Sequence, residues 1–218
     1  TASLGIGTGG SFALMGVFLA YADYRFATLI CCGGVFLAGM FVLFLVPPNI
    51  IRPLSDTQKK RHPLDLRPAF YKPEALGYIF AYAAHTYELF AYRTWSFALL
   101  VFLVGRADGN VGIGGVTVIV SLITVTGLLA SLLGAKICLT LGRHRVIALI
   151  GAASVLVSFL AALSLDGPIW MAIAGLWIYN IFIMLDSGAL TTGTVEAGDE
   201  HDRGALLAVH SMIGFAGG

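Results

Sequence analysis

Six long apolar runs follow one another along the chain, and they restrict the fold more than any other feature. They cover residues 3–21, 26–46, 75–104, 112–141, 146–165 and 168–191, and a seventh run begins at residue 204. Because an α-helix rises about 1.5 Å per residue, about 20 apolar residues cross a hydrocarbon core about 30 Å thick. The runs therefore predict a series of transmembrane helices.

Composition supports the same class of protein. Hydrophobic residues make up 58% of the chain and charged residues 11%, and the mean hydropathy is +0.88, which leaves too little polar surface for a soluble domain. A backbone in lipid must satisfy its own hydrogen bonds, and no run shows the period-two alternation of membrane strands. We therefore expect an all-α integral membrane protein, multi-pass, with the lipid bilayer as its surroundings.

Residues 47–74 form the one polar linker, since they hold six of the seven prolines and the basic run Lys59–Arg61. We expect this linker to be a solvated tether between two membrane units, residues 1–46 and residues 75–218. Most lysines and arginines fall on the linker's side of the predicted helices, whereas Arg25 and Arg106 fall on the opposite side. The positive-inside rule then places the linker in the cytoplasm.

The two ends of the sequence predict a fragment of a longer chain. The sequence begins at Thr1 without a charged leader, and the seventh run stops at Gly218, well short of a membrane thickness. We expect two complete helices before the linker, and four helices and part of a fifth after it.

Two loops carry motifs of one transporter family. Residues 24–26 read Tyr-Arg-Phe after a glycine-rich run, and residues 141–145 read Leu-Gly-Arg-His-Arg. The second loop is similar to the basic end of the signature G-x-L-a-D-r-x-G-R-K/R, although Leu139 stands where the signature has aspartate. With a long basic loop between two sets of helices, the chain resembles helices five to ten and the start of helix eleven of the major facilitator superfamily.

The resemblance implies a secondary active transporter of the cell membrane that moves a small solute by alternating access, with symport, antiport and uniport all open as its mode. Glu196 and Arg203 match a further family pattern, E-x6-R, and the spacing could bring Glu196 opposite Arg143. A solvated surface pair is the alternative. We expect a cytoplasmic gate of Arg143, Arg145, Asp186, Glu196 and Arg203, with Asp186 beside Arg143 and Lys136.

The third run carries a polar stripe in an otherwise apolar span. At about 100° per residue its members fall within a sector of about 160°. A charge facing lipid at mid-membrane costs at least about 2.5 kcal/mol, so the stripe is predicted to face other helices or a watery cavity. The stripe consists of Tyr78, Tyr82, His85, Glu88, Tyr92, Arg93, Trp95 and Ser96.

The stripe supplies the candidate site for substrate and protons. His85 and Glu88 are one helical turn apart and can share a proton, which a proton-coupled carrier could use. Arg93 keeps its charge and favours an anionic or zwitterionic substrate, and Tyr82 and Tyr92 offer hydroxyls and ring faces. The alternative is a buried structural pair of Glu88 and Arg93.

The sixth run adds one further candidate to the site. Its polar residues Trp177, Asn180, Ser187 and Thr191 share one helix face, and Asn180 lies nearest mid-membrane. We expect Asn180 to complete the cavity wall, with a hydrogen bond between helices as the alternative.

Other chemistries find less support. Gly5, Gly7 and Gly10 spell G-x-G-x-x-G, but no strand precedes them, so close helix packing explains them better than a dinucleotide site. His85-x-x-Glu88 has no second ligand pair, so we expect no metal and no cofactor. Cys31, Cys32 and Cys138 lie in apolar runs and are expected to be lipid-facing or packing residues. The net charge of +1 indicates no nucleic-acid partner.

Two other function classes stay open beside the carrier. One is a membrane sensor or receptor that does not transport, although a retinal photoreceptor would need a lysine in its last span and residues 204–218 contain none. The other is a membrane-embedded enzyme that uses His85 and Glu88. We expect a monomeric carrier, not an enzyme, with a small molecule as its partner.

Overall fold

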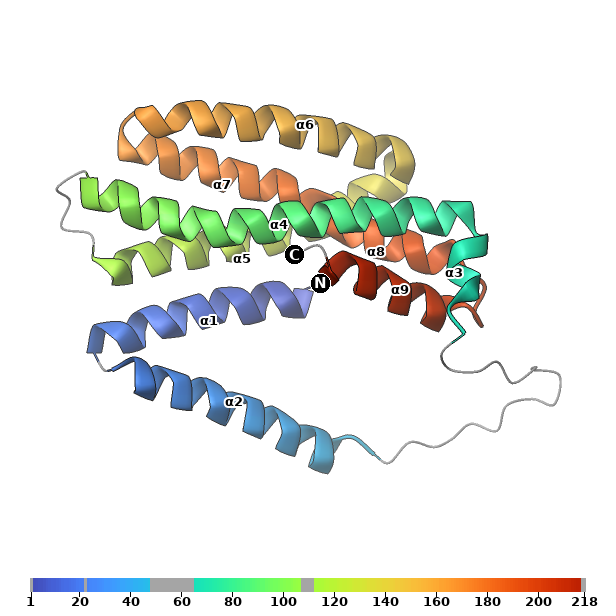
Figure 1. Cartoon of the computed structure of the whole chain (residues 1–218), viewed down its shortest axis with the longest axis horizontal. Helices are drawn as coiled ribbons and strands as arrows, with labels where there is room; N and C mark the ends of the chain where they lie inside the picture. The colour runs from blue at the N-terminus through green and yellow to red at the C-terminus, as the bar shows by residue number, and fades with distance from the viewer. Residues whose placement is uncertain (1, 22, 48–64, 107–111, 217–218) are drawn as a thin grey trace.

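The computed structural model describes residues 2–21, 23–47, 65–106 and 112–216, and these are helical along almost their whole length (Figure 1). The basic run Lys59–Arg61 of the linker and residues 107–111 lie outside the described residues. The elements are α1 (Ala2–Tyr21), α2 (Tyr24–Leu45), α3 (Arg67–Tyr71), α4 (Pro73–Arg106), α5 (Ile113–Leu141), α6 (Arg143–Leu163), the 3-10 turn η1 (Ser164–Asp166), α7 (Ile169–Leu185), α8 (Ser187–Glu196) and α9 (Arg203–Ala216).

Five stretches of the described residues are long and apolar enough to cross a membrane. Their lengths of 22 to 34 residues match or exceed the thickness of a hydrocarbon core. The prediction of an all-α membrane protein is therefore confirmed. The stretches are Tyr24–Leu45, Pro73–Arg106, Gly114–Leu141, Arg143–Asp166 and Ile169–Glu196.

Proline and glycine set several of the helix ends. Helix α2 ends at Leu45, two residues before Pro47, because a residue that precedes proline avoids the helical conformation. Helix α4 begins with Pro73, whose missing N–H is not needed in the first turn. Gly142 joins α5 to α6 with φ of +93°, a conformation that other residues rarely adopt.

The sixth predicted run differs from one continuous helix. It is interrupted at Asp186, so that α7 ends at Leu185 and α8 begins at Ser187. Asp186 keeps right-handed helical angles, and the amide of Leu190 still donates to its carbonyl oxygen at 2.9 Å. The interruption is therefore a local distortion within one span, Ile169–Glu196, and not a change of direction.

The turns alternate between two ends of the bundle, as the predicted threading requires (Figure 1). One end holds α3, the turn between α5 and α6, and the connection between α8 and α9. The other end holds the turn between α1 and α2 and the turn from α6 to α7. The described basic residues of the linker side, such as Lys72 and Arg143, therefore share one end, and Arg25 and Arg106 lie at the other.

The last residues of the predicted linker fold against the second membrane unit. Helix α3 packs against α4 and α9, and its residues Pro68 and Ala69 are buried. A small apolar cluster of Ala69, Ala75, Ile79, Leu206 and Val209 holds this corner together. A tether free in solvent was expected for the whole linker, so the structure departs from that expectation at residues 65–72.

Helix α5 lies at the centre of the packing, against α1, α7 and α8. It carries glycines where α7 approaches: a Cβ at Gly127 would lie 2.7 Å from Asn180 Nδ2, and one at Gly134 would overlap the carbonyl group of Leu185. Helix α7 can therefore lie close to the α5 backbone, which lets short polar side chains reach across.

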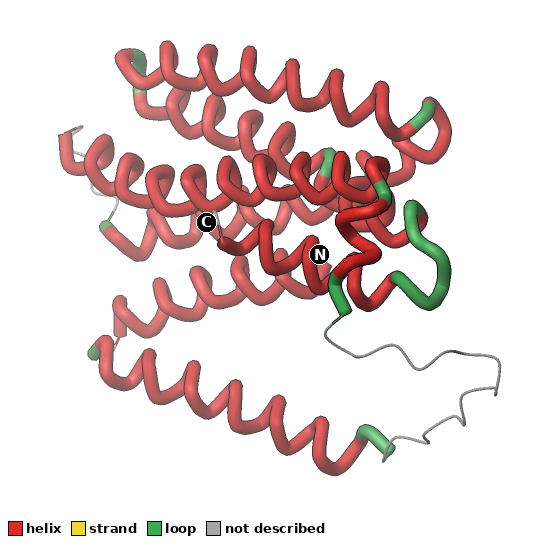
Figure 2. The backbone as a smooth tube through the Cα atoms, turned by 45° about the vertical axis from the view of Figure 1, so that its right-hand side comes forward, coloured by secondary structure: helices red, strands yellow, loops and turns green. Residues whose placement is uncertain are grey.

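Helix α1 packs on the opposite side of α5 through other glycines than those predicted. Cβ atoms at Gly7 and Gly10 would meet nothing within 4 Å, whereas one at Gly9 would lie 3.1 Å from Val125 and one at Gly16 would overlap Thr117. Gly9 and Gly16 are seven residues apart and so share one helix face. Helix α2 diverges from the bundle, and Ala27 is the one buried residue among its described side chains (Figure 2).

We predict that Gly134→Ala lowers the thermal stability of the purified protein, because the added methyl group meets the backbone of Leu185. Overpacking of this kind costs about 1–3 kcal/mol. Gly151→Ala on α6 is the matched control, since a Cβ there meets nothing within 4 Å. Equal melting temperatures for the two variants would show that α5 and α7 do not approach as closely as described.

Candidate functional site

The polar stripe of α4 faces the neighbouring helices, as predicted, with one exception. Tyr82, His85, Tyr92 and Ser96 are buried, whereas Trp95 is 72% exposed. Helices α7, α8 and α9 cover this face of α4. The burial of the stripe between helices agrees with the high free-energy cost of exposing polar and charged side chains to lipid.

His85 pairs with Asp186 rather than with Glu88. Its Nδ1 atom lies 2.8 Å from Asp186 Oδ1, and the exposed fractions of the two side chains are 3% and 15%. Neither atom has a hydrogen bond of good geometry among the described residues, and the contact is an ion pair only when the imidazole is protonated. The carboxylate in contact with His85 is therefore that of Asp186, whereas the sequence predicted a proton shared with Glu88.

The sequence places Asp186 with Arg143 and Lys136, but in the described residues its ion contact is with His85. Asp186 stands at the interruption between α7 and α8, where α4 crosses and presents His85. Arg143 lies nearer the linker end and pairs with Glu196 instead. A half-buried carboxylate is stabilised by a polar partner at the same depth in the bundle, and for Asp186 this partner is His85.

A second buried histidine extends this group of side chains. His210 on α9 is 2% exposed, and its ring stacks on that of Tyr82 with centroids 3.7 Å apart. Its Nδ1 lies 2.9 Å from Thr194 Oγ1, whereas its Nε2 is buried without a hydrogen-bond partner among the described residues. We call Tyr82, His85, Asp186 and His210 the histidine cluster.

His210 is the one member of the histidine cluster that the sequence did not assign to a site. His210 falls in the short seventh run, where too few neighbours define a helix face. A signal was nevertheless present, because an ionisable residue in an apolar span marks a candidate site by itself. Among the described residues no group of three His, Cys, Asp or Glu side chains is arranged to hold a metal ion.

Glu88 forms a separate polar group with two other helices. The hydroxyls of Ser154 on α6 and Tyr179 on α7 both donate to Glu88 Oε1, at 2.7 Å and 2.9 Å. The hydroxyl of Tyr92 donates to the carbonyl oxygen of Leu176 at 2.8 Å, and its ring stands perpendicular to that of Tyr179. His85 and Glu88 thus have different partners, and the pair that an enzyme would have used is not formed.

Asn180 makes the hydrogen bond between helices that was the alternative to a cavity wall. Its Nδ2 donates to the carbonyl oxygen of Ile123 at 2.8 Å, and the side chain is 3% exposed. Nearby, Trp177 Nε1 donates to Thr126 Oγ1 at 2.8 Å. Both contacts fasten α7 to α5, so Asn180 holds helices together and lies outside the histidine cluster.

Arg93 is half-buried and has no ion pair or hydrogen bond within the described part of the chain. The structural pair of Glu88 and Arg93 is therefore not formed. Arg93 shares a face of α4 with Phe97, four residues later, and Phe97 stacks on Phe12 of α1 with ring centroids 5.9 Å apart. Arg93 accordingly lies on the side of α4 that is turned toward α1.

The linker end of the bundle brings part of the predicted gate together. Arg143 Nη2 lies 2.9 Å from Glu196 Oε2, as the sequence suggested, and the guanidinium also lies over the ring of Tyr78. Arg145 and Arg203 are exposed and form no ion pair in the described ranges.

A second ion-pair group at this end was not predicted. Lys72 Nζ lies 2.7 Å from Asp199 Oδ2 and 3.0 Å from Asp202 Oδ2, and so ties the start of α4 to the connection before α9. The hydrogen bond to Asp199 raises the pKa of Lys72 above its ordinary 10.5, and the same bond lowers the pKa of Asp199 below 3.8. The linker prolines predict a solvated tether, and no local pattern indicates which acidic residues Lys72 contacts.

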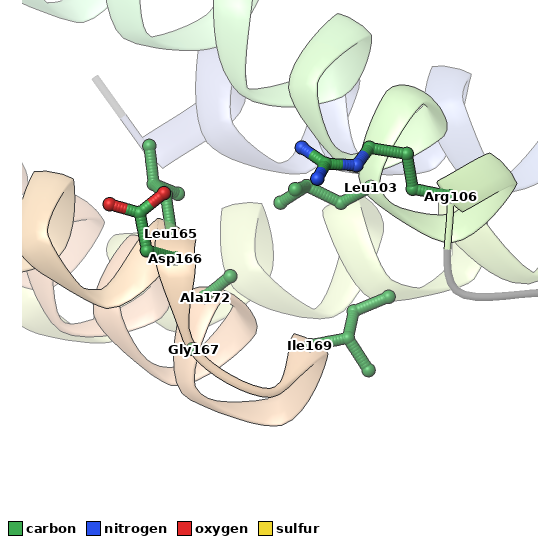
Figure 3. A pocket seen from close by; sticks show the side chains of 7 residues that line it. All are labelled: Leu103, Arg106, Leu165, Asp166, Gly167, Ile169 and Ala172. Atoms are coloured by element: carbon green, nitrogen blue, oxygen red, sulfur yellow. The ribbon is translucent and has the colours of Figure 1, made fainter.

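The opposite end of the bundle carries a small pocket of about 190 Å³ (Figure 3). Arg106 of α4 and Asp166 of η1 stand on opposite sides of it, and Leu103, Ile169 and Ala172 line its apolar part. Both charged side chains are exposed.

Comparison of the chain with protein-family models, with curated proteins and with solved structures finds no match.

We predict that Arg143 and Glu196 are energetically coupled. A double-mutant cycle with Arg143→Ala and Glu196→Ala, measured by thermal unfolding, should give a coupling energy of about 0.5–1 kcal/mol, because Glu196 is partly exposed to solvent. Arg145→Ala combined with Glu196→Ala is the matched control and should show no coupling. A coupling energy of zero between Arg143 and Glu196 would contradict the contact.

We predict that acid releases the connection between α8 and α9. Because the pKa of folded Asp199 is lowered, its contribution is present above pH 3.8 and is lost as the pH falls through the lowered value. The contribution of Lys72, whose pKa is raised, is lost only as the pH rises beyond 10.5. A spin label at exposed position 200, with Cys31 and Cys32 replaced by serine, should be immobile at pH 7 and mobile in acid.

The Lys72→Gln variant should leave this label mobile at both pH values. Lys136→Gln, at an exposed lysine without an ion pair in the described ranges, should behave like the parent protein. A label that stays immobile in Lys72→Gln would show that other contacts dock the connection.

Proposed function

We propose that the chain forms part of a secondary active transporter of the major facilitator type, which moves a small solute by alternating access and couples this movement to protons. The sequence motifs in residues 24–26, 141–145 and 196–203 support the family. The contact between His85 and Asp186 supports the coupling, and it is the single observation on which the proposal rests.

A buried imidazole beside a carboxylate suits proton coupling for a physical reason. In a low dielectric, a charge on one group acts strongly on a group this close to it, so a proton gained by either group changes the interaction between them. Protonation of such a pair changes the attraction between the helices that carry it. Here these helices are α4 and the span made of α7 and α8, which meet at the interruption beside Asp186.

The position of Asp186 within a membrane span supports a role in transport. Ionisable residues inside membrane spans commonly mark substrate and ion paths. Asp186 lies within the span Ile169–Glu196, so its carboxylate reaches the bundle interior rather than the loops. Glu88, which was the first candidate for the proton, is engaged by Tyr179 and Ser154.

We place the substrate path beside Arg93 of α4. Arg93 is half-buried and has no ion pair or hydrogen bond in the described ranges, so it can receive an anionic group of an anionic or zwitterionic solute. The pair of Arg143 and Glu196 lies at the linker end and would break and re-form as that end opens and closes. We place this end in the cytoplasm, from the excess of lysine and arginine there.

We predict that Asp186→Asn in the complete protein reduces proton-driven accumulation of solute by about tenfold or more, since a charged partner of His85 is lost. Exchange of labelled for unlabelled solute across the membrane, which needs no net proton movement, should persist. Asp166→Asn, at an exposed position at the very end of the span Arg143–Asp166, is the matched control and should leave both activities intact. Undiminished accumulation by Asp186→Asn would remove the pair from coupling.

A further inference from the structure

A groove between α4 and α7 is lined by aromatic rings around one carboxylate. Its volume is about 360 Å³, and the rings of Tyr87, Tyr92, Trp95 and Tyr179 surround Glu88. Tyr87 and Trp95 are 65% and 72% exposed and form the rim, whereas Tyr92 is buried at the floor. This groove is separate from the histidine cluster, none of whose residues line it.

The carboxylate of Glu88 is only half satisfied. Ser154 and Tyr179 both donate to Oε1, and within the described residues no donor reaches Oε2. Oε2 is also not fully buried, so this oxygen can accept a contact from a ligand in the groove. The two hydroxyls hold the carboxylate in one orientation, which lowers the cost of binding a ligand to it.

The groove has negative charge without a compensating cation. Arg93, the nearest arginine or lysine along α4, is five positions from Glu88, which is about 140° around the helix, and it does not line the groove; His85 does not line it either. Aromatic rings present a negative face, and cations bind to this face within about 6 Å of the ring centre. A carboxylate among four such rings is complementary to a cation with an apolar surface.

We propose that this groove binds a small lipophilic organic cation, such as a quaternary ammonium compound that carries an aromatic or alkyl group. The carboxylate of Glu88 neutralises the ligand's charge, and the rings of Tyr87, Trp95 and Tyr179 cover its apolar groups. Glu88 lies near the middle of α4 (Pro73–Arg106), at a depth that the choline group of a lipid does not reach. The ligand is therefore a soluble cation that partitions into the membrane, and not a lipid headgroup.

Binding of benzyltrimethylammonium to the purified full-length chain in neutral detergent, measured by isothermal titration calorimetry, tests the proposal. We expect saturable binding to the parent protein and no competition by benzenesulfonate, an anion of similar size. Glu88→Gln should weaken binding by about tenfold, because it removes the charge. Glutamine still accepts hydrogen bonds from Ser154 and Tyr179, so the variant is expected to fold.

A pair of tryptophan variants provides a second and independent test. Trp95→Ala at the rim should weaken binding by about two- to fivefold, through loss of a cation–ring contact. Trp170→Ala is the matched control, because Trp170 is similarly exposed, at 66%, and lies outside the groove. If Glu88→Gln does not fold, this pair alone decides.

Three results would overturn the proposal: absence of saturable binding, equal affinity for benzenesulfonate, or equal effects of the two tryptophan variants. The measurement uses no gradient and no transported solute. A protein that binds the cation but shows no transport would therefore contradict the proposed function and leave the groove assignment intact.

Discussion

The cost of placing polar and ionisable groups in a membrane governs the whole arrangement. A buried group without a partner loses several kcal/mol of hydration, so a donor or acceptor on another helix stabilises it strongly. Helix α4 carries several such groups, among them His85, Glu88 and Tyr92. Its partners come from four other elements: Asp186 at the α7–α8 junction, His210 of α9, Ser154 of α6 and Tyr179 of α7. The polar face of α4 thus determines which helices surround it.

These contacts also require that the helices lie close together, and glycine makes this possible. Gly127 and Gly134 of α5 remove the side chains that would hold α7 away, and Asn180 then reaches the carbonyl oxygen of Ile123. Gly214 plays the same part for α9, because a Cβ there would overlap the ring of Tyr82 that stacks on His210. Close backbone approach and short polar bonds are therefore two aspects of one packing solution.

The sequence predicted what depends on local pattern and missed what depends on contacts between distant segments. Hydropathy identified the spans, and helical periodicity identified the inward face of α4, because both are properties of neighbouring residues. The partner of His85 could not be found in this way, since Asp186 is about a hundred positions away and its direction depends on the interruption between α7 and α8. Gly9 and Gly16, rather than Gly7 and Gly10, meet α5 because the rotation of α1 is set by packing. The contact of Arg143 with Glu196 was predicted correctly because both ends of it lie at turns whose side of the bundle was already known.

The two polar groups of α4 are adjacent along the helix but are tied to different surroundings. His85 contacts the junction of α7 and α8. Glu88, one turn later, is held by Ser154 of α6 and Tyr179 of α7. A helix is stiff over one turn, so a tilt of α4 against α7 would change both sets of contacts together. In the proposed carrier, a proton gained at His85 or Asp186 would weaken one attachment of α4 and alter the position of Glu88 in the groove. Coupling between a proton site and a ligand groove then needs no long path, because a single helix carries both and two arrangements of that helix are enough.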